Sequence, residues 1–176
     1  PRTAYELGGL ASVLTQEGHL AAARAKLERA RDILERVFGP ADQRVAEILN
    51  NLGTSCRRMG DLTGARRSLE RGVEAAKMAF GAQSPKVAVS ASNLGYVLQE
   101  MGELEAARDA FSEALSVDES AFGAVDVRVA VDASNLAAVL RDAGDLDDAA
   151  ELYFKAVCIR RALPELDRLA LAGDLG

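Results

Sequence analysis

Histidine is almost absent from this sequence, and the single copy, His19, follows a glycine in a stretch that reads as a turn. Catalysis or metal binding by His19 would need partner side chains. The sequence shows no nucleophile matched to a histidine, no cluster of metal ligands and no glycine-rich phosphate loop. We therefore predict that the protein is not an enzyme and that it uses no metal and no cofactor.

Aromatic residues and long apolar runs are also scarce. Aromatics make up 5% of the chain and tryptophan is missing, although 49% of the residues are hydrophobic. Alanine and leucine dominate that fraction, which favours close-packed helices over a β-sandwich. No apolar run approaches the roughly 20 residues that a membrane helix needs. The net charge of -6, with acids and bases interspersed, argues against nucleic acid as a partner. We expect no membrane partner and a cytoplasmic location.

The sequence does contain a regular repeat. A glycine, a polar residue and a leucine recur together, followed three residues later by alanine. The spacing between successive copies is 42 residues each time, and a period of about 20 to 50 residues indicates a repeat architecture. The glycines are Gly18, Gly60, Gly102 and Gly144.

Each repeat reads as two antiparallel helices. Ile48, Leu49, Leu52 and Cys56 recur at the three- and four-residue steps typical of a helix. The first helix of each pair, helix A, is predicted at 1–17, 43–59, 85–101 and 127–143. The second, helix B, is predicted at 19–37, 61–79, 103–121 and 145–163.

Short polar residues and glycines mark the predicted helix ends. Asp42, Ser84 and Asp126 share one column of the repeat, and each suits the N-cap of a helix A. Gly60 suits the left-handed position that ends a helix. The chain is thus predicted to be a single domain, 1–176. Its repeats would span 1–42, 43–84, 85–126 and 127–164, followed by a short C-terminal helical cap or frayed tail at 165–176.

These columns resemble the tetratricopeptide repeat. That family's pattern asks for a leucine followed by glycine or alanine, then a glycine, an alanine, a large residue and a small one. The second repeat has Leu52, Gly53, Gly60, Ala65, Leu69 and Gly72, the third has Leu94, Gly95, Gly102, Ala107, Phe111 and Ala114, and the fourth has Leu136, Ala137, Gly144, Ala149, Tyr153 and Ala156.

The period exceeds the usual length of about 34 residues. With the Asn50-Asn51-Leu52-Gly53 sequence, it resembles the kinesin-light-chain type of repeat. The resemblance implies an all-α fold, a right-handed α-solenoid of four helical hairpins. Bacteria use this type of repeat widely, and the excess of arginine over lysine fits a bacterial source.

The same resemblance implies that helix A lines the concave side of the solenoid. Asn51, Asn93 and Asn135 would then form a ladder there, one asparagine per repeat. In grooves of the kinesin-light-chain type, such asparagines hold the main chain of a bound peptide. An amide side chain both donates and accepts hydrogen bonds, so it suits that role. The alternative is that these asparagines bond to the neighbouring helix and stabilise stacking.

Further candidates surround the ladder on the same helices. Tyr96 is the best single anchor for a ligand, and Arg57, Arg58 and Arg141 could pair with a ligand carboxylate. The alternative for the charged members is an ordinary solvated helix face. The remaining candidate residues are Asn50, Thr54, Ser92, Gln99 and Ser134.

Two other patterns carry expectations about stability. Cys56 and Cys158 occupy apolar helical positions in different repeats, so we predict two buried, free thiols in a reducing compartment. A basic residue near the start of each helix A is expected to pair with acids of the preceding helix B; the alternative is a basic strip for an acidic partner. Those basic residues are Arg2, Arg44, Lys86 and Arg128.

The most direct functional prediction is a protein–protein interaction module that binds a peptide or protein segment in its concave groove. The alternative is a sensor or assembly region of a larger bacterial signalling protein, with contacts to a neighbouring domain or a second copy. Helix B of the fourth repeat is the most apolar of its kind, which would favour assembly. Its extra apolar face would need covering by the C-terminal tail, another subunit or a missing repeat.

Overall fold

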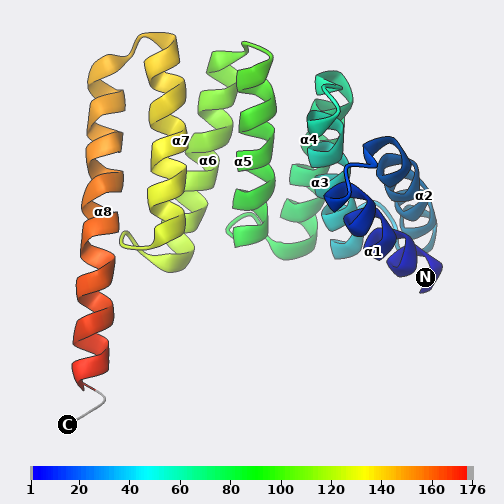
Figure 1. Ribbon diagram of the computed structural model, residues 1–176, viewed down its shortest axis with the longest axis horizontal. Helices are drawn as coiled ribbons and strands as arrows, with labels where there is room; N and C mark the ends of the chain where they lie inside the picture. The colour runs from blue at the N-terminus through cyan, green and yellow to red at the C-terminus, as the bar shows by residue number, and fades with distance from the viewer. Residues whose placement is uncertain (1, 174–176) are drawn as a thin grey trace.

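The computed structural model describes residues 2–173, and the side chains of residues 2–163. Within that range it contains eight helices and no strand, and consecutive helices lie side by side in chain order (Figure 1). The predicted all-α solenoid of four helical hairpins is thereby confirmed. The helices are α1 (Arg2–Gln16), α2 (Leu20–Phe38), α3 (Gln43–Arg58), α4 (Leu62–Phe80), α5 (Pro85–Glu100), α6 (Leu104–Phe122), α7 (Val127–Ala143) and α8 (Leu146–Gly173).

The ends of α1 to α7 lie within one residue of the predicted ends, because the capping residues act as expected. The side chains of Asp42, Ser84 and Asp126 each accept a hydrogen bond from the backbone N–H two residues later, at 3.0, 3.3 and 2.8 Å. Gly60 adopts a φ of 77°, which a side chain at that position would oppose. Local residue chemistry therefore sets the repeat boundaries.

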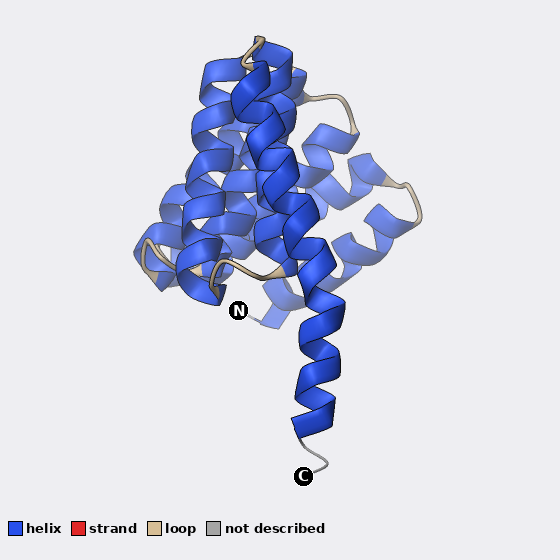
Figure 2. Ribbon diagram, turned by 90° about the vertical axis from the view of Figure 1, so that its left-hand side faces the viewer, coloured by secondary structure: helices blue, strands red, loops and turns tan. Residues whose placement is uncertain are grey.

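Helix α8 differs from its prediction. It continues as one helix through Pro164 to Gly173 and projects beyond the other helices (Figure 2). The expectation of a separate short helix covering the last repeat is therefore wrong. Proline removes one backbone donor and often ends a helix, but good helix formers flank Pro164 on both sides and the helix continues. Residues 174–176, predicted to fray, lie outside the described residues.

One consequence is an open apolar surface on the last helix. Leu146, Phe154 and Val157 are exposed, and the Phe154 side chain reaches 71% exposure. The C-terminal part of α8 runs past the solenoid instead of folding back over it (Figure 2). Within the described residues, the apolar face predicted on this helix is thus uncovered.

Close contact between the two helices of a hairpin depends on one small residue. A Cβ atom added to Gly95 would lie 2.8 Å from the ring of Phe111, so the ring fills the space that this glycine leaves. The same substitution at Gly53 would meet Leu69 at 2.3 Å. Phe111 and Leu69 are both fully buried. Large and small residues on facing helices therefore interlock inside the second and third hairpins.

Ion pairs between successive B helices fix the stacking register. Each B–B contact contains one pair in the same two columns of the repeat, and the signs of the charges reverse in the middle contact. Because exchanging the repeats would place like charges opposite each other, the pairs favour this order over alternatives. The pairs are Glu35 with Arg71, Lys77 with Glu113, and Glu119 with Lys155.

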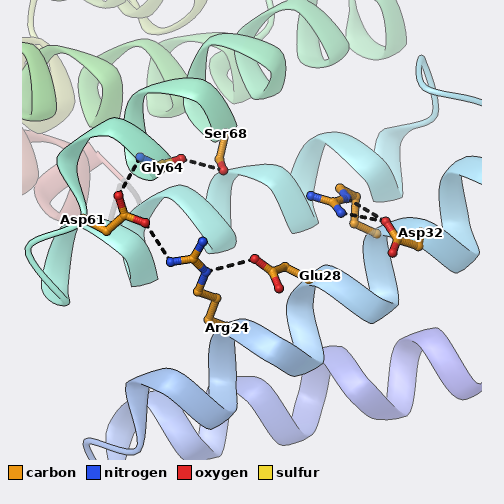
Figure 3. Close-up of polar contacts among 7 residues, drawn as sticks. Arg24, Glu28, Asp32, Asp61, Gly64 and Ser68 are labelled. Atoms are coloured by element: carbon orange, nitrogen blue, oxygen red, sulfur yellow. Dashed lines mark hydrogen bonds and ion pairs between the residues drawn. The ribbon is translucent and has the colours of Figure 1, made fainter.

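A second set of contacts links one helix B to the capping turn of the next. The Arg24 guanidinium donates to Asp61 at 2.7 Å and to Glu28 at 2.9 Å (Figure 3). Asp61 also accepts from the Gly64 N–H at 2.9 Å, and together these donors hold the pKa of its carboxyl below the ordinary value. One repeat later, Arg66 contacts Glu103 at 2.7 Å in the same way. Successive hairpins are thus tied at their turns.

Candidate functional site

The A helices, α1, α3, α5 and α7, form one face of the solenoid with a groove between each successive pair. Groove 1, between α1 and α3, encloses about 190 Å³; groove 2, between α3 and α5, about 230 Å³; and groove 3, between α5 and α7, about 480 Å³. The intervening helix B supplies residues to each groove, namely Leu34, Ala76 and Asp118. These three residues are also 42 positions apart, so the grooves repeat with the sequence.

The predicted asparagine ladder lies on this face. Asn51 borders grooves 1 and 2, whereas Asn93 and Asn135 line groove 3. Asn93 Nδ2 donates to Asn50 Oδ1 at 2.9 Å, which joins α5 to α3. Within residues 2–163, the side chains of Asn51 and Asn135 make no hydrogen bond to the protein. Asn93 therefore contributes to stacking. The second amide hydrogen and the side-chain carbonyl oxygen of Asn93 are still open to a ligand.

Most of the predicted carboxylate-binding residues are engaged within the protein. Arg57 donates to Glu100 at 2.8 Å, and Gln99 donates to Asp142 at 2.8 Å, one repeat further along. Arg141 also pairs with Asp142, at 2.7 Å. These contacts join the C-terminal ends of α3, α5 and α7, so a ligand carboxylate would have to compete with them. Arg58 is exposed.

The predicted hydroxyl groups also bond internally. Thr54 donates to the Asn51 carbonyl at 3.0 Å, and Ser134 donates to the Ala130 carbonyl at 2.8 Å. Both hydroxyls thus serve the backbone of their own helix. Ser92 instead donates to the Asp132 carboxylate across groove 3, at 2.9 Å.

Tyr96 lies in groove 3 and is half-buried. Its ring packs edge-to-face against Phe111, with 5.2 Å between centroids and 78° between planes. The Arg57 guanidinium lies 5.3 Å from its centroid. The core ring and this cation fix its orientation, so the exposed part of Tyr96 is a rigid surface in the groove.

The expected pairing of basic residues with acids of the preceding helix B is wrong. Arg44 and Arg128 each bond to the aspartate that caps their own helix, at 2.6 and 2.8 Å. Their guanidinium groups lie 3.4 and 3.2 Å from the centroids of Phe38 and Phe122, at the end of the preceding helix B. The reason is that the capping aspartate binds the N–H edge of the guanidinium while the ring packs against one of its faces. Lys86 contacts Glu47 at 3.2 Å, and Arg2 contacts Glu6 at 3.2 Å.

Two aspartates in groove 3 are not among the site residues predicted from the sequence. Asp118 of α6 and Asp132 of α7 are each 5% exposed, and their carboxyl groups are close enough to share a hydrogen bond. Burial raises the pKa of both carboxyls, and that of Asp132 reaches about 6. The sequence signal was weak: Asp118 aligns with the apolar Leu34 and Ala76, whereas Asp132 aligns with Ile48 and the polar Ser90.

Replacing Asp132 with asparagine is expected to stabilise the protein at pH 7 by about 2 kcal/mol, or roughly 5 °C in Tm. The folded-state pKa of about 6 exceeds the ordinary 3.8, so the native chain holds a proton that the unfolded chain lacks between these values. Native stability therefore falls as pH rises from about 4 to 6. Asparagine keeps an acceptor for Ser92 and has no charge, so the gain should vanish near pH 4.

Thermal unfolding followed by circular dichroism from pH 4 to pH 8 measures this difference. Asp109→Asn is the control, because it removes the same charge from an exposed position of α6. A gain equal at pH 4 and pH 7, or one matched by the control, would mean that the Asp132 carboxyl is not destabilised by burial.

The two cysteines differ in their surroundings. Both thiols are free; Cys56 is buried, but Cys158 is exposed, so the prediction of two buried thiols is wrong for the second. Cys158 lies on α8, where no further repeat packs in the described chain. Across residues 2–173 no helix has the length and apolarity to cross a membrane. The same residues contain no cluster of histidine, cysteine and carboxylate side chains suited to a metal ion.

Solved structures confirm the fold. BtubC (BKLC) of P. vanneervenii superposes with a TM-score of 0.86 at 24% identity, over 92% of this chain and 64% of that protein's length. A kinesin light chain-like protein of Podosopora anserina with nearly identical TPR-like repeats superposes with a TM-score of 0.80 at 18% identity. The match covers 90% of this chain and 75% of that protein's length. The apo form of RapI superposes with a TM-score of 0.82 at 15% identity, over 93% of this chain and 58% of that protein's length. At these identities the likeness concerns the fold alone.

A family model gives the assignment. No curated protein matches the sequence closely enough to count as a relative. The model of the tetratricopeptide repeat matches three overlapping stretches, residues 2–78, 44–120 and 86–162, each of which spans nearly two of the repeats described above. Repeats of this kind generally serve as non-catalytic scaffolds for protein–protein interaction. The chain belongs to the tetratricopeptide-repeat family.

Proposed function

We propose that the helix A face binds an extended segment of another protein across grooves 1 to 3. The observation that carries this proposal is the placement of asparagine. The sequence contains four asparagines, and all four lie on this one face; Asn51, Asn93 and Asn135 occupy equivalent positions of successive A helices, and Asn50 lies next to Asn51. A residue type confined to one surface, with unused donors and acceptors, suits a contact that does not depend on ligand side chains.

The spacing of the ladder also supports an extended ligand. Packed helices lie about 8–10 Å apart, and an extended chain rises about 3.4 Å per residue. One asparagine would therefore meet every third peptide unit. Because an amide pairs with any peptide group, the ladder would supply affinity, whereas the side chains in the grooves would supply specificity. Two free cysteines favour a reducing, cytoplasmic setting for this binding.

A selection experiment tests the proposal. The chain would be immobilised and used to select binders from a phage library of random 12-residue peptides, and a selected peptide would be synthesised for calorimetry. We expect saturable 1:1 binding with a Kd in the micromolar range. The proposal would be contradicted if the library yields no such binder, or if the selected peptides bind away from the helix A face.

A second candidate function is assembly through α8, which the exposed Leu146, Phe154 and Val157 favour. In that case the partner would be a second copy of this chain, and the chain would serve as the assembly region of a larger signalling protein. Light scattering after size exclusion at micromolar concentration separates the two. A monomer favours ligand capture, whereas a dimer that Phe154→Glu converts to a monomer favours assembly.

A further inference from the structure

The three grooves share their architecture but differ in one pair of residues. At equivalent positions, groove 1 has Leu34 and Ile48, groove 2 has Ala76 and Ser90, and groove 3 has Asp118 and Asp132. The third pair is the only one that is charged. Groove 3 also has about twice the volume of groove 2. The repeat thus provides two uncharged versions of the same site within one chain.

The acidic pair is incompletely satisfied. Asp118 is 5% exposed, lines groove 3, and its Oδ1 atom has no hydrogen-bond partner. Asp132 accepts from Ser92, and the two carboxyl groups face each other. Buried polar atoms are nearly always paired, and a buried carboxylate without a donor is costly. The acidic pair beside this open groove is therefore short of a donor, which points to a ligand that brings one.

The cations nearest the pair are occupied. Arg128 lines the same groove, but both its Nε and Nη2 atoms bond to the capping aspartate, Asp126, at 2.8 Å. Lys86 also lines the groove and contacts Glu47 on α3. Arg128 lowers the pKa of the Asp118 carboxyl and Asp126 raises it, yet burial outweighs both. The carboxyls of Asp118 and Asp132 therefore still lack a cation of their own.

The walls above the pair are apolar. Val89, Val127 and Val131 line the groove and are each about half-exposed, at 53%, 55% and 43%. The ring of Tyr96 forms another part of the lining. A side chain that suits this site has an aliphatic stem for the walls and a charged head for the carboxyls. Lysine and arginine have this construction.

We propose that groove 3 binds a long basic side chain, lysine or arginine, of the bound segment, with its charged head against the carboxyl groups of Asp118 and Asp132. This inference rests on the proposed function, since the basic residue belongs to the segment that the asparagines hold. Grooves 1 and 2 would take apolar or small side chains. The expected ligand is thus a segment with one basic residue at the position that faces groove 3.

Binding of the cation and binding of a proton exclude each other at this pair. When the ligand's charged head enters, a proton bound to the pair leaves to solvent, and the ammonium or guanidinium donates to the carboxyls in its place. Affinity should therefore fall as the solution is acidified from pH 7 to pH 5. Binding at pH 6 should release protons, which calorimetry detects by comparing buffers with different ionisation enthalpies.

The test uses a peptide selected from the random 12-residue library. One substitution is made in the peptide and another, separately, in the protein. In the peptide, the basic residue becomes norleucine for lysine or citrulline for arginine, which keeps the stem and removes the charge. In the protein, the double variant Asp118→Ala, Asp132→Ser reproduces the residues of groove 2 and is expected to fold. Each change should weaken binding about 30-fold or more. Asp109→Ala, an exposed acid of α6, should change it less than about twofold.

The outcomes separate this inference from the function on which it rests. Binders without an enriched basic residue, or an unchanged Kd after either substitution, would overturn the inference and leave peptide capture standing. A library that yields no binder would overturn both. Because the norleucine or citrulline arm uses the unaltered protein, the result does not depend on the folding of the double variant.

Discussion

Replacing Phe111 with alanine is expected to lower the free energy of unfolding by about 4 kcal/mol. The Phe111 side chain is fully buried, and its ring fills the space beside Gly95 and supports Tyr96 edge-to-face. Alanine would leave a cavity that the rigid neighbouring backbone cannot close, and the aromatic contact would be lost as well. Urea denaturation followed by circular dichroism at 222 nm, a standard helix signal, measures the loss.

Phe154→Ala is the matched control for this substitution. The Phe154 side chain is 71% exposed on α8, so its removal should change stability by less than about 0.5 kcal/mol. If both substitutions cost the same, Phe111 does not occupy the core of its hairpin. The Phe111 variant should also lose peptide binding in groove 3, because Tyr96 would no longer be held in place.

Replacing Asn51, Asn93 and Asn135 together with alanine is expected to weaken binding of a selected peptide about 100-fold. Each asparagine should contribute one hydrogen bond to the peptide main chain, worth about 1 kcal/mol net, and three such bonds correspond to roughly a hundredfold in Kd. The helical circular dichroism signal should be unchanged, because these side chains lie at the surface of the grooves. Calorimetric titration provides the measurement.

Asn50→Ala provides the control that separates ligand contact from stacking. It removes the acceptor of the Asn93 hydrogen bond and leaves the ladder intact. If the asparagines only stabilise stacking, Asn50→Ala and Asn93→Ala should have equal effects on stability, and the triple variant should bind the peptide normally. That pattern would reject the ladder as a ligand contact.

The repeat made most of the fold predictable from sequence. Glycines and capping residues recur every 42 residues, so an error at one helix end would have conflicted with the other copies, and α1 to α7 match within one residue. The prediction failed at α8, where no later copy constrains the reading of Pro164. Proline often ends a helix, but the sequence on both sides of Pro164 favours one and α8 continues through it.

The candidate site was predictable in position but not in chemistry. The column of asparagines could be assigned to one face because helix A repeats in register. The contacts of Arg57 and Gln99 could not be predicted, because they depend on the offset between neighbouring helices, which brings Glu100 and Asp142 within reach. The acidic pair of groove 3 joins residues of two different helices. Its only sequence signal was the replacement of an apolar residue by Asp118 in one of the two columns.

The most direct measurement is a two-dimensional NMR spectrum of the side-chain amides, recorded with and without a selected peptide. All four asparagines of the chain lie on the helix A face, so their amide signals report on that face alone. We predict that the Asn51, Asn93 and Asn135 signals shift on titration, and that Asn135 shifts less when the peptide's basic residue is replaced by norleucine or citrulline. Saturable binding that leaves all four signals unmoved would show that the ligand binds elsewhere.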